Sequence, residues 1–104
     1  MVYTVEQIKQ ITRPIAAAYG VKSMRLFGSY ARGEATESSD VDILVDRGDI
    51  LSGFALGGLY ADLRDGLRKE LDMVTTQGAD AEFLSRIQKD EVLIYEQHGF
   101  FRFQ

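Results

Sequence analysis

The sequence of 104 residues contains no cysteine, one histidine and one proline. Without cysteine the chain can form neither disulfide bonds nor thiolate metal sites, and a single histidine, His98, cannot build a histidine-rich zinc centre. No apolar run approaches the ~18 residues that a membrane span requires, and the N-terminus lacks a charged-then-apolar signal pattern. We therefore expect no contact with a membrane and a cytoplasmic location.

Basic charge is also scarce. Lysine and arginine together number 12 against 16 aspartates and glutamates, which gives a net charge of −4 and a pI near 4.9. Non-specific binding to nucleic acid needs a basic surface that displaces counterions, so we expect no direct nucleic-acid partner. The length and the 45% hydrophobic content suit one domain over residues 1–104, too small to include a separate acceptor-binding domain.

Two carboxylates stand two positions apart in a predicted strand over residues 40–45. Val41, Ile43 and Val45 fall on the alternate positions that a buried strand face requires, so Asp40 and Asp42 are predicted to share the other face. Carboxylate oxygens at this spacing can converge on Mg²⁺. A lone Asp-x-Asp pair is more often simply solvated, and this alternative stays open for the pair alone.

A glycine and a serine follow the preceding apolar run, residues 24–27, and lead into a helix-compatible segment. Such a junction points backbone N–H groups outward, and these donors together with the Ser29 hydroxyl suit a polyphosphate. Gly28 lets the phosphates approach the backbone because it carries no side chain. By itself, Gly-Ser is also an ordinary turn.

Together, the Gly-Ser junction and the Asp-x-Asp pair are a more specific signal than either motif alone. The chain resembles the DNA polymerase β-like nucleotidyltransferase superfamily in its signature, which is Gly28-Ser29, ten intervening residues and then Asp40-x-Asp42. The sequence Gly-Ser-Tyr-Ala-Arg-Gly at residues 28–33 resembles the minimal nucleotidyltransferase (MNT) branch of that superfamily. That family carries a third acidic residue on a later strand, and Asp72 fits the position. The resemblance implies an α+β, two-layer fold: a short mixed sheet of three to four strands packed with helices.

The same resemblance implies a site and a reaction. Gly28 and Ser29 would hold the phosphates of ATP, while Asp40, Asp42 and Asp72 would bind Mg²⁺, two ions in this superfamily. The third carboxylate would also orient or deprotonate an acceptor hydroxyl, which attacks the α-phosphorus and expels pyrophosphate. Two roles remain open for Arg32: it could bind a phosphate, or it could form a structural ion pair with a neighbouring acidic residue.

Stand-alone proteins of this branch resemble antitoxins of type VII-like pairs, whose toxin is a HEPN-domain ribonuclease. The implied function is AMP transfer from ATP to a tyrosine of the toxin, with which the chain would form a hetero-oligomer. Two alternatives remain. A non-catalytic antitoxin would neutralise its toxin by contact, through features such as the phenylalanine-rich tail, residues 100–103. A nucleotidyltransferase that acts on a small molecule would need an acceptor pocket, which a dimer could build between its subunits.

Apolar spacing and turn residues predict the remaining elements. A capping box, Thr4 to Gln7, starts a helix over residues 5–19 that Pro14 should kink or split. A second long helix is predicted over residues 52–69, where four glycines suggest either a late start near Gly57 or close approach of a partner or phosphate. Strands are predicted over residues 21–27, 40–45 and 71–75, and one or two helices over residues 79–95.

Overall fold

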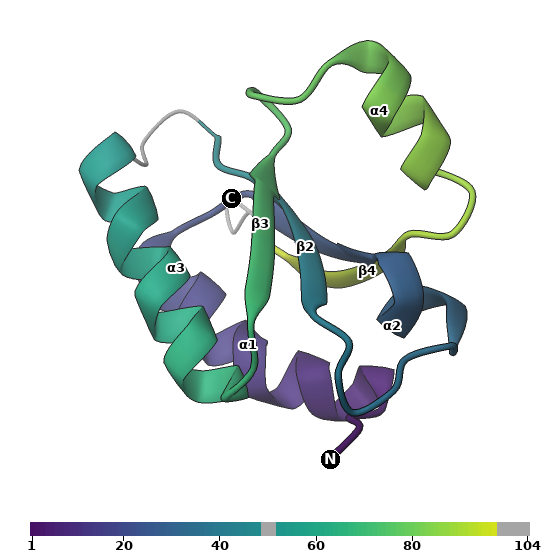
Figure 1. Cartoon of the computed structure of the whole chain (residues 1–104). Coiled ribbons are helices and arrows are strands. Elements are labelled where there is room, and N and C mark those ends of the chain that lie inside the picture. Colours follow the sequence, from purple (N-terminus) through teal and green to yellow (C-terminus); the bar gives the residue numbers. More distant parts are fainter. Residues whose placement is uncertain (49–51, 98–104) are drawn as a thin grey trace, which may run out of the picture.

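The computed structural model describes residues 1–48 and 52–97, which form four helices and four strands (Figure 1). In chain order these are α1 (Val5–Tyr19), β1 (Ser23–Phe27), α2 (Gly28–Arg32), β2 (Val41–Asp46), α3 (Gly53–Leu67), β3 (Leu71–Thr75), α4 (Ala81–Ile87) and β4 (Val92–Glu96). The strands form one sheet in the order β3-β2-β1-β4. β1 is antiparallel to β2 and β4, whereas β2 and β3 are parallel. The predicted α+β fold with a short mixed sheet is confirmed.

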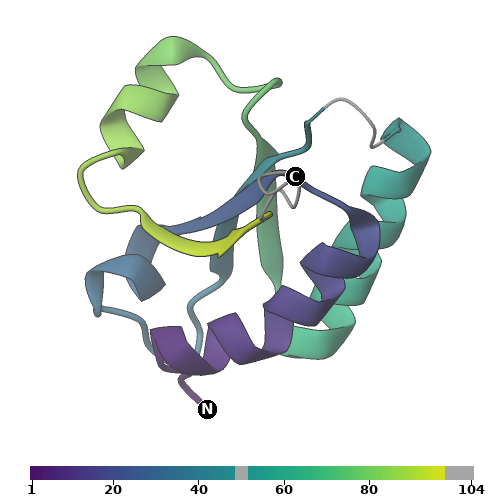
Figure 2. The same ribbon diagram turned by 180° about the vertical axis from the view of Figure 1, so that it is seen from behind.

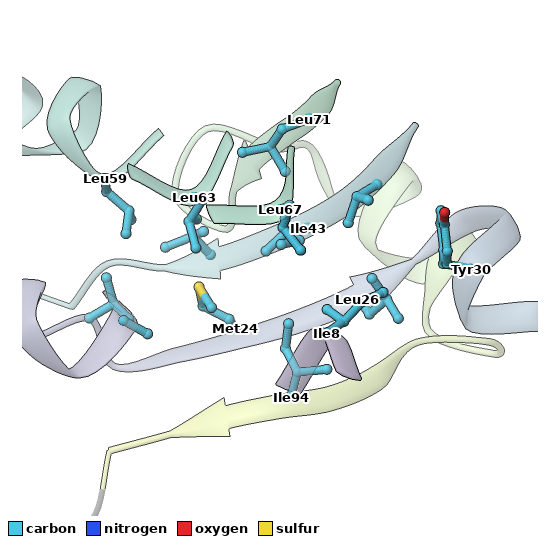
Figure 3. Packing of buried hydrophobic residues seen from close by; sticks show 14 residues of the cluster. Ile8, Met24, Leu26, Tyr30, Ile43, Leu59, Leu63, Leu67, Leu71 and Ile94 are labelled. Atoms are coloured by element: carbon cyan, nitrogen blue, oxygen red, sulfur yellow. The ribbon is translucent and has the colours of Figure 1, made fainter. Parts of the chain in front are cut away.

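Helices α1 and α3 lie side by side on one face of the sheet, and α4 lies over the other face (Figures 1 and 2). The core fills the space between the sheet and helices α1 and α3, as the close-up shows (Figure 3). Its members alternate along the strands, as period-two patterning requires. They include Ile8 and Ala16 of α1, Leu59, Leu63 and Leu67 of α3, and Met24, Leu26, Val41, Ile43, Val45, Leu71 and Ile94 of the sheet.

Helix α1 begins and ends where the sequence predicts. The Thr4 hydroxyl accepts a hydrogen bond from the Gln7 N–H, the Gln7 side chain accepts one from the Thr4 N–H, and Gly20 ends the helix in the left-handed conformation. The helix is not split at Pro14, which lies inside it on the exposed side. A proline removes one helical hydrogen bond, and here the rest of the 15-residue helix and its buried stripe hold the element together.

The prediction of helix over residues 79–95 was wrong in its second half. Helix α4 ends at Ile87, and residues 92–96 form β4, which pairs with β1 across a register irregularity at Met24 and Arg25. Ile87, Glu91 and Ile94 fit helical spacing, but the segment around Ile94 is rich in β-branched and aromatic residues. The segment becomes a strand because it pairs with the edge of β1 that would otherwise be open.

The late start proposed for α3 was also wrong, because the helix begins at Gly53 with the Ser52 hydroxyl accepting from the Ala55 N–H. Two of its glycines face α1. A Cβ on Gly58 would lie 2.8 Å from the Tyr19 hydroxyl oxygen, and one on Gly66 would lie 3.1 Å from Ile15 Cδ1. A Cβ on Gly57 would meet nothing within 4 Å. Close packing between α1 and α3 thus accounts for two of the four glycines.

No helix in residues 1–48 and 52–97 is long and apolar enough to cross a membrane. His98 and the phenylalanine-rich tail lie outside the described residues. The cytoplasmic location and the single domain over residues 1–104 stay predictions.

Gly57 and Gly58, which are neighbours on α3, give a matched test of the packing between α1 and α3. We expect Gly57→Ala to stabilise the protein by about 0.5–1 kcal/mol, because alanine is the better helix former and the site is open. Gly58→Ala should gain less or lose stability, because its methyl group would displace the Tyr19 hydroxyl from its 2.7 Å hydrogen bond to Asp62. Urea unfolding of both variants measures the difference; equal gains would contradict the packing.

Candidate active site

Three side chains form a row across the face of the sheet that is turned away from α1 and α3. Phe27 of β1 pairs with Asp42 of β2, and Asp42 in turn pairs with Asp72 of β3. Directly paired residues on neighbouring strands, about 4.8 Å apart, point to the same face. The parallel pairing of β2 with β3 therefore brings together two acidic residues that are 30 positions apart in the sequence.

The environment of Asp42 disfavours its negative charge. Partial burial, the charge of Asp72 with a hydrogen bond to it, and the charge of Asp40 raise the pKa of Asp42 to about 6, while the charge of Arg32 acts in the opposite direction. Asp72 is exposed and Asp42 is half-buried. A cation placed between these carboxylates would relieve the repulsion, which is the electrostatic requirement of a divalent metal site.

Gly28 lies in close contact with the carboxylate of Asp42. It follows β1 directly, has φ of +73°, and a Cβ at this position would lie 2.9 Å from Asp42 Cγ and closer still to Oδ2. Any side chain at position 28 would therefore displace Asp42, and the left-handed backbone itself favours glycine. The sequence prediction attributed this glycine to phosphate approach alone. The structure adds a second reason, contact with the carboxylate.

Ser29 and Arg32 lie on α2, next to Asp42. Ser29 is half-buried, and its carbonyl oxygen accepts hydrogen bonds from the N–H groups of Gly33 and Glu34 at the end of α2. Arg32 pairs with Glu34, with 3.0 Å between Nε and Oε1. Both partners are exposed, so the pair contributes little stability and would yield readily to a phosphate.

Asp40 differs from its predicted placement. β2 begins at Val41, so Asp40 lies in the loop one residue before the strand, where it is exposed. Within residues 1–48 and 52–97, no group of three acidic or histidine side chains stands close enough together to hold a metal ion. The structure therefore brings Asp42 and Asp72 together and keeps Asp40 near enough to act on Asp42 electrostatically. The ligand set Asp40, Asp42 and Asp72 stays a prediction.

Asp46 is the last residue of β2, and its carboxylate holds the turn that follows the strand. It accepts hydrogen bonds from Gln77 Nε2 at 2.9 Å and from the Gly48 N–H at 3.1 Å. These contacts, led by that from Gln77, hold the pKa of Asp46 below its ordinary value. The carboxylate is thus engaged at the opposite end of β2 from Asp42.

One neighbour of the site was missed by sequence reasoning. Phe83 of α4 packs edge-to-face on Phe27, with ring centroids 5.6 Å apart, and a cavity of about 400 Å³ separates the rest of α4 from Leu44 and Arg25. Phe83 falls within the helix predicted over residues 79–95, and no local sequence signal ties it to the carboxylates. The pairing of Phe27 with Asp42, visible only once the register is known, shows that α4 rests beside the carboxylates.

The fold and the site define a class of protein, a nucleotidyltransferase. Residues 6–99 match the family described as polymerase beta, nucleotidyltransferase, and the chain belongs to this family. Its relatives include a candidate protein adenylyltransferase of Methanocaldococcus jannaschii, 39% identical over 88 residues that cover 85% of this chain and 95% of the relative. The protein adenylyltransferase MntA of Thermococcus cleftensis is 42% identical over 76 residues, covering 67% of this chain and 77% of MntA.

The chain is also similar to a chain in the solved complex of the tri-AMPylated HEPN toxin of Shewanella oneidensis with its MNT antitoxin. The TM-score is 0.69 at 19% identity, over 90% of this chain and 74% of the other. At this identity the likeness establishes the fold.

Gly28 and Gly33 form a matched pair for testing the contact with Asp42. Both have φ of +73°, but a Cβ on Gly33 meets nothing within 4 Å. We expect Gly28→Ala and Gly33→Ala each to lose about 1 kcal/mol through backbone strain. Only Gly28→Ala should also lower nucleotidyl transfer, by about 100-fold or more, because it displaces Asp42. Equal activities in the two variants, measured by pyrophosphate release, would contradict the assignment.

Asp42 should make stability depend on pH. A carboxyl whose pKa is higher in the folded state, about 6 against an ordinary 3.8, binds its proton more tightly when folded. Its charge therefore costs no stability below about pH 4, costs more as the pH rises to about 6, and costs a constant amount above. We expect Asp42→Asn to raise the melting temperature at pH 7–8 in a chelator and to lose that gain by pH 4.

The control for this titration is Asp90→Asn, a change at an exposed aspartate in the turn after α4. Its melting temperature should follow that of the wild type at every pH. A gain for Asp42→Asn that is the same at pH 4 and pH 8 would show that charge is not its cause.

Proposed function

We propose that this chain is an MNT antitoxin that transfers AMP from ATP to a tyrosine of a HEPN-domain ribonuclease toxin in a Mg²⁺-dependent reaction. The observation that carries the proposal is the contact of Gly28 with Asp42 beside Asp72. It supports the proposal because the turn that we propose to bind phosphate lies against one of the two carboxylates that we propose to bind Mg²⁺. Relatives named protein adenylyltransferases support the choice of reaction.

Each residue has a role in this reaction. The Ser29 hydroxyl and the backbone N–H groups after Gly28 hold the β- and γ-phosphates, with Arg32 available as a further phosphate contact. Asp42 and Asp72, joined by Asp40 from the adjacent loop, hold one or two Mg²⁺ ions. Mg²⁺ held there would neutralise the charge that develops on the phosphoryl oxygens.

Asp72 is the carboxylate best placed to receive the acceptor, because it is exposed on the edge strand whereas Asp42 is half-buried. It accepts the proton of the tyrosine hydroxyl as the oxygen attacks the α-phosphorus in line. The new bond joins the tyrosine oxygen to phosphorus, and the bond to the bridging oxygen breaks, which releases pyrophosphate. The attached AMP adds negative charge and bulk where the toxin would bind RNA.

A second candidate, neutralisation by binding alone, is favoured by one feature of α3. Phe54 is 95% exposed, and beside it Gly53 and Gly57 leave open space. Large exposed aromatic side chains commonly anchor protein interfaces. The two functions share a partner and differ in whether the toxin is modified.

The decisive experiment is an intact-mass spectrum of the HEPN-domain protein encoded beside this chain, after incubation with the chain, ATP and Mg²⁺. We expect mass increments of one or more AMP units, located on tyrosine by fragmentation. The Asp40→Asn, Asp42→Asn double variant should lower the rate by about 10²–10³-fold or more, because it removes charge stabilisation from the transition state.

Asp90→Asn serves as the matched control and should modify the toxin at the wild-type rate. An unmodified toxin that nevertheless co-elutes with the wild-type chain would exclude the transferase and support neutralisation by binding. Modification that persists in the double variant would remove Asp40 and Asp42 from the proposed site.

A further inference from the structure

The loop that carries Asp40 is held by the short connection between α3 and β3. The two segments lie at the same end of the sheet (Figure 1). Lys69 Nζ donates to the carbonyl oxygen of Glu37 at 3.1 Å, which ties the loop before Asp40. The Val41 N–H donates to the carbonyl oxygen of Glu70 at 3.0 Å, which ties the chain after Asp40. Asp40 is therefore exposed but lies between two fixed points.

The same loop is also closed on itself. The Ser39 N–H donates to the carbonyl oxygen of Thr36 at 3.0 Å, and the Thr36 N–H donates to Ser39 Oγ at 2.8 Å. Ser39 directly precedes Asp40. A turn closed in this way has few conformations of its own, so the hydrogen bond from Lys69 to the loop is enough to set its orientation relative to the sheet.

Lys69 also contacts the helix that follows the proposed phosphate turn. Its Nζ lies 6.0 Å from the centroid of the Tyr30 ring, at the outer limit of a cation–π contact. Tyr30 is on α2 and is only 3% exposed. Within residues 1–48 and 52–97 its hydroxyl forms no hydrogen bond, so packing alone holds the ring. Lys69 thus joins the loop of Asp40 to α2.

The burial of Lys69 makes its contact with the loop effective. Lysine side chains are mostly exposed, as Lys89 is in the turn after α4, whereas Lys69 is half-buried. A half-buried lysine has fewer rotamers to lose when it forms a hydrogen bond. Its hydrogen bond to Glu37 therefore costs less conformational entropy than one from a freely solvated lysine.

A carboxylate on a loop binds a metal ion well only if it need not first be ordered, because ordering costs conformational entropy. Asp42 and Asp72 are fixed by the pairing of β2 with β3, whereas Asp40 lies before β2. We propose that Lys69 is a positioning residue that holds Asp40 beside these two carboxylates to complete the Mg²⁺ site. This inference rests on the proposed function for the role of Asp40 as a metal ligand.

The test measures how much Mg²⁺ strengthens the binding of a non-hydrolysable ATP analogue, as the ratio of its Kd in chelator to its Kd at saturating Mg²⁺. Lys69→Met removes the ammonium group and keeps a long side chain. We expect this variant to lower the ratio by about tenfold, the effect of losing one hydrogen bond from a charged donor. Its Kd in chelator should match that of the wild type.

Two further variants control for the substitution itself. Lys69→Arg keeps a cationic donor and should restore most of the ratio. Lys89→Met makes the same chemical change at an exposed lysine and should match the wild type. Hydrogen–deuterium exchange of residues 33–41 gives a readout without metal or nucleotide, and we expect faster exchange in Lys69→Met alone.

A double-mutant cycle with Asp40→Asn separates positioning from general damage to the fold. Because Lys69 acts through Asp40, Lys69→Met should lower the ratio no further in the Asp40→Asn background. An equal loss in that background, a weaker affinity in chelator, or agreement between Lys69→Met and Lys89→Met overturns the inference.

The same measurements distinguish this inference from the proposed function. If the wild type binds the analogue equally well with and without Mg²⁺, the proposed metal site is wrong and the role of Lys69 falls with it. If Mg²⁺ strengthens binding but the HEPN-domain protein is not modified, the proposed transfer fails, and the cycle still decides the role of Lys69.

Discussion

The pairing of β2 with β3 sets the constraint on which the site depends. It holds Asp42 and Asp72 side by side, although their charges repel each other and part of Asp42 is withdrawn from water. The hydrophobic core beneath supplies the stabilisation, because Val41, Ile43 and Leu71 alternate with these carboxylates and are buried against α3 and α1. The same alternation that builds the core therefore directs the acidic side chains outward.

Much of this arrangement could be predicted because local signals agreed with the global fold. The capping box fixed the start of α1, and alternation within residues 71–75 placed Asp72 opposite Leu71 and Met73. The Gly-Ser and Asp-x-Asp motifs pointed to one site before any distance was known. Their meaning came from the resemblance to a family, since neither motif alone distinguishes a catalytic site from a solvated turn.

What could not be predicted depends on contacts between distant segments. β4 becomes a strand because β1 offers a free edge, and the apolar spacing around Ile94 is compatible with either structure. The contact of Gly28 with Asp42, and the approach of Gly58 to Tyr19, are likewise set by packing. Asp40 falls outside β2 by one residue, so a carboxylate that was predicted on the strand face lies in the loop before the strand.

The position of the carboxylates also bears on which acceptor the site can serve. Asp72 is exposed, and α4 covers the same face farther along the strands, over Leu44 and beside Phe27. Nucleotidyl transfer needs water kept from the α-phosphorus, or hydrolysis competes with the acceptor. In the part of the chain that the structure describes, Asp40 is exposed as well as Asp72. A protein acceptor would bring its hydroxyl and cover these exposed carboxylates at the same time.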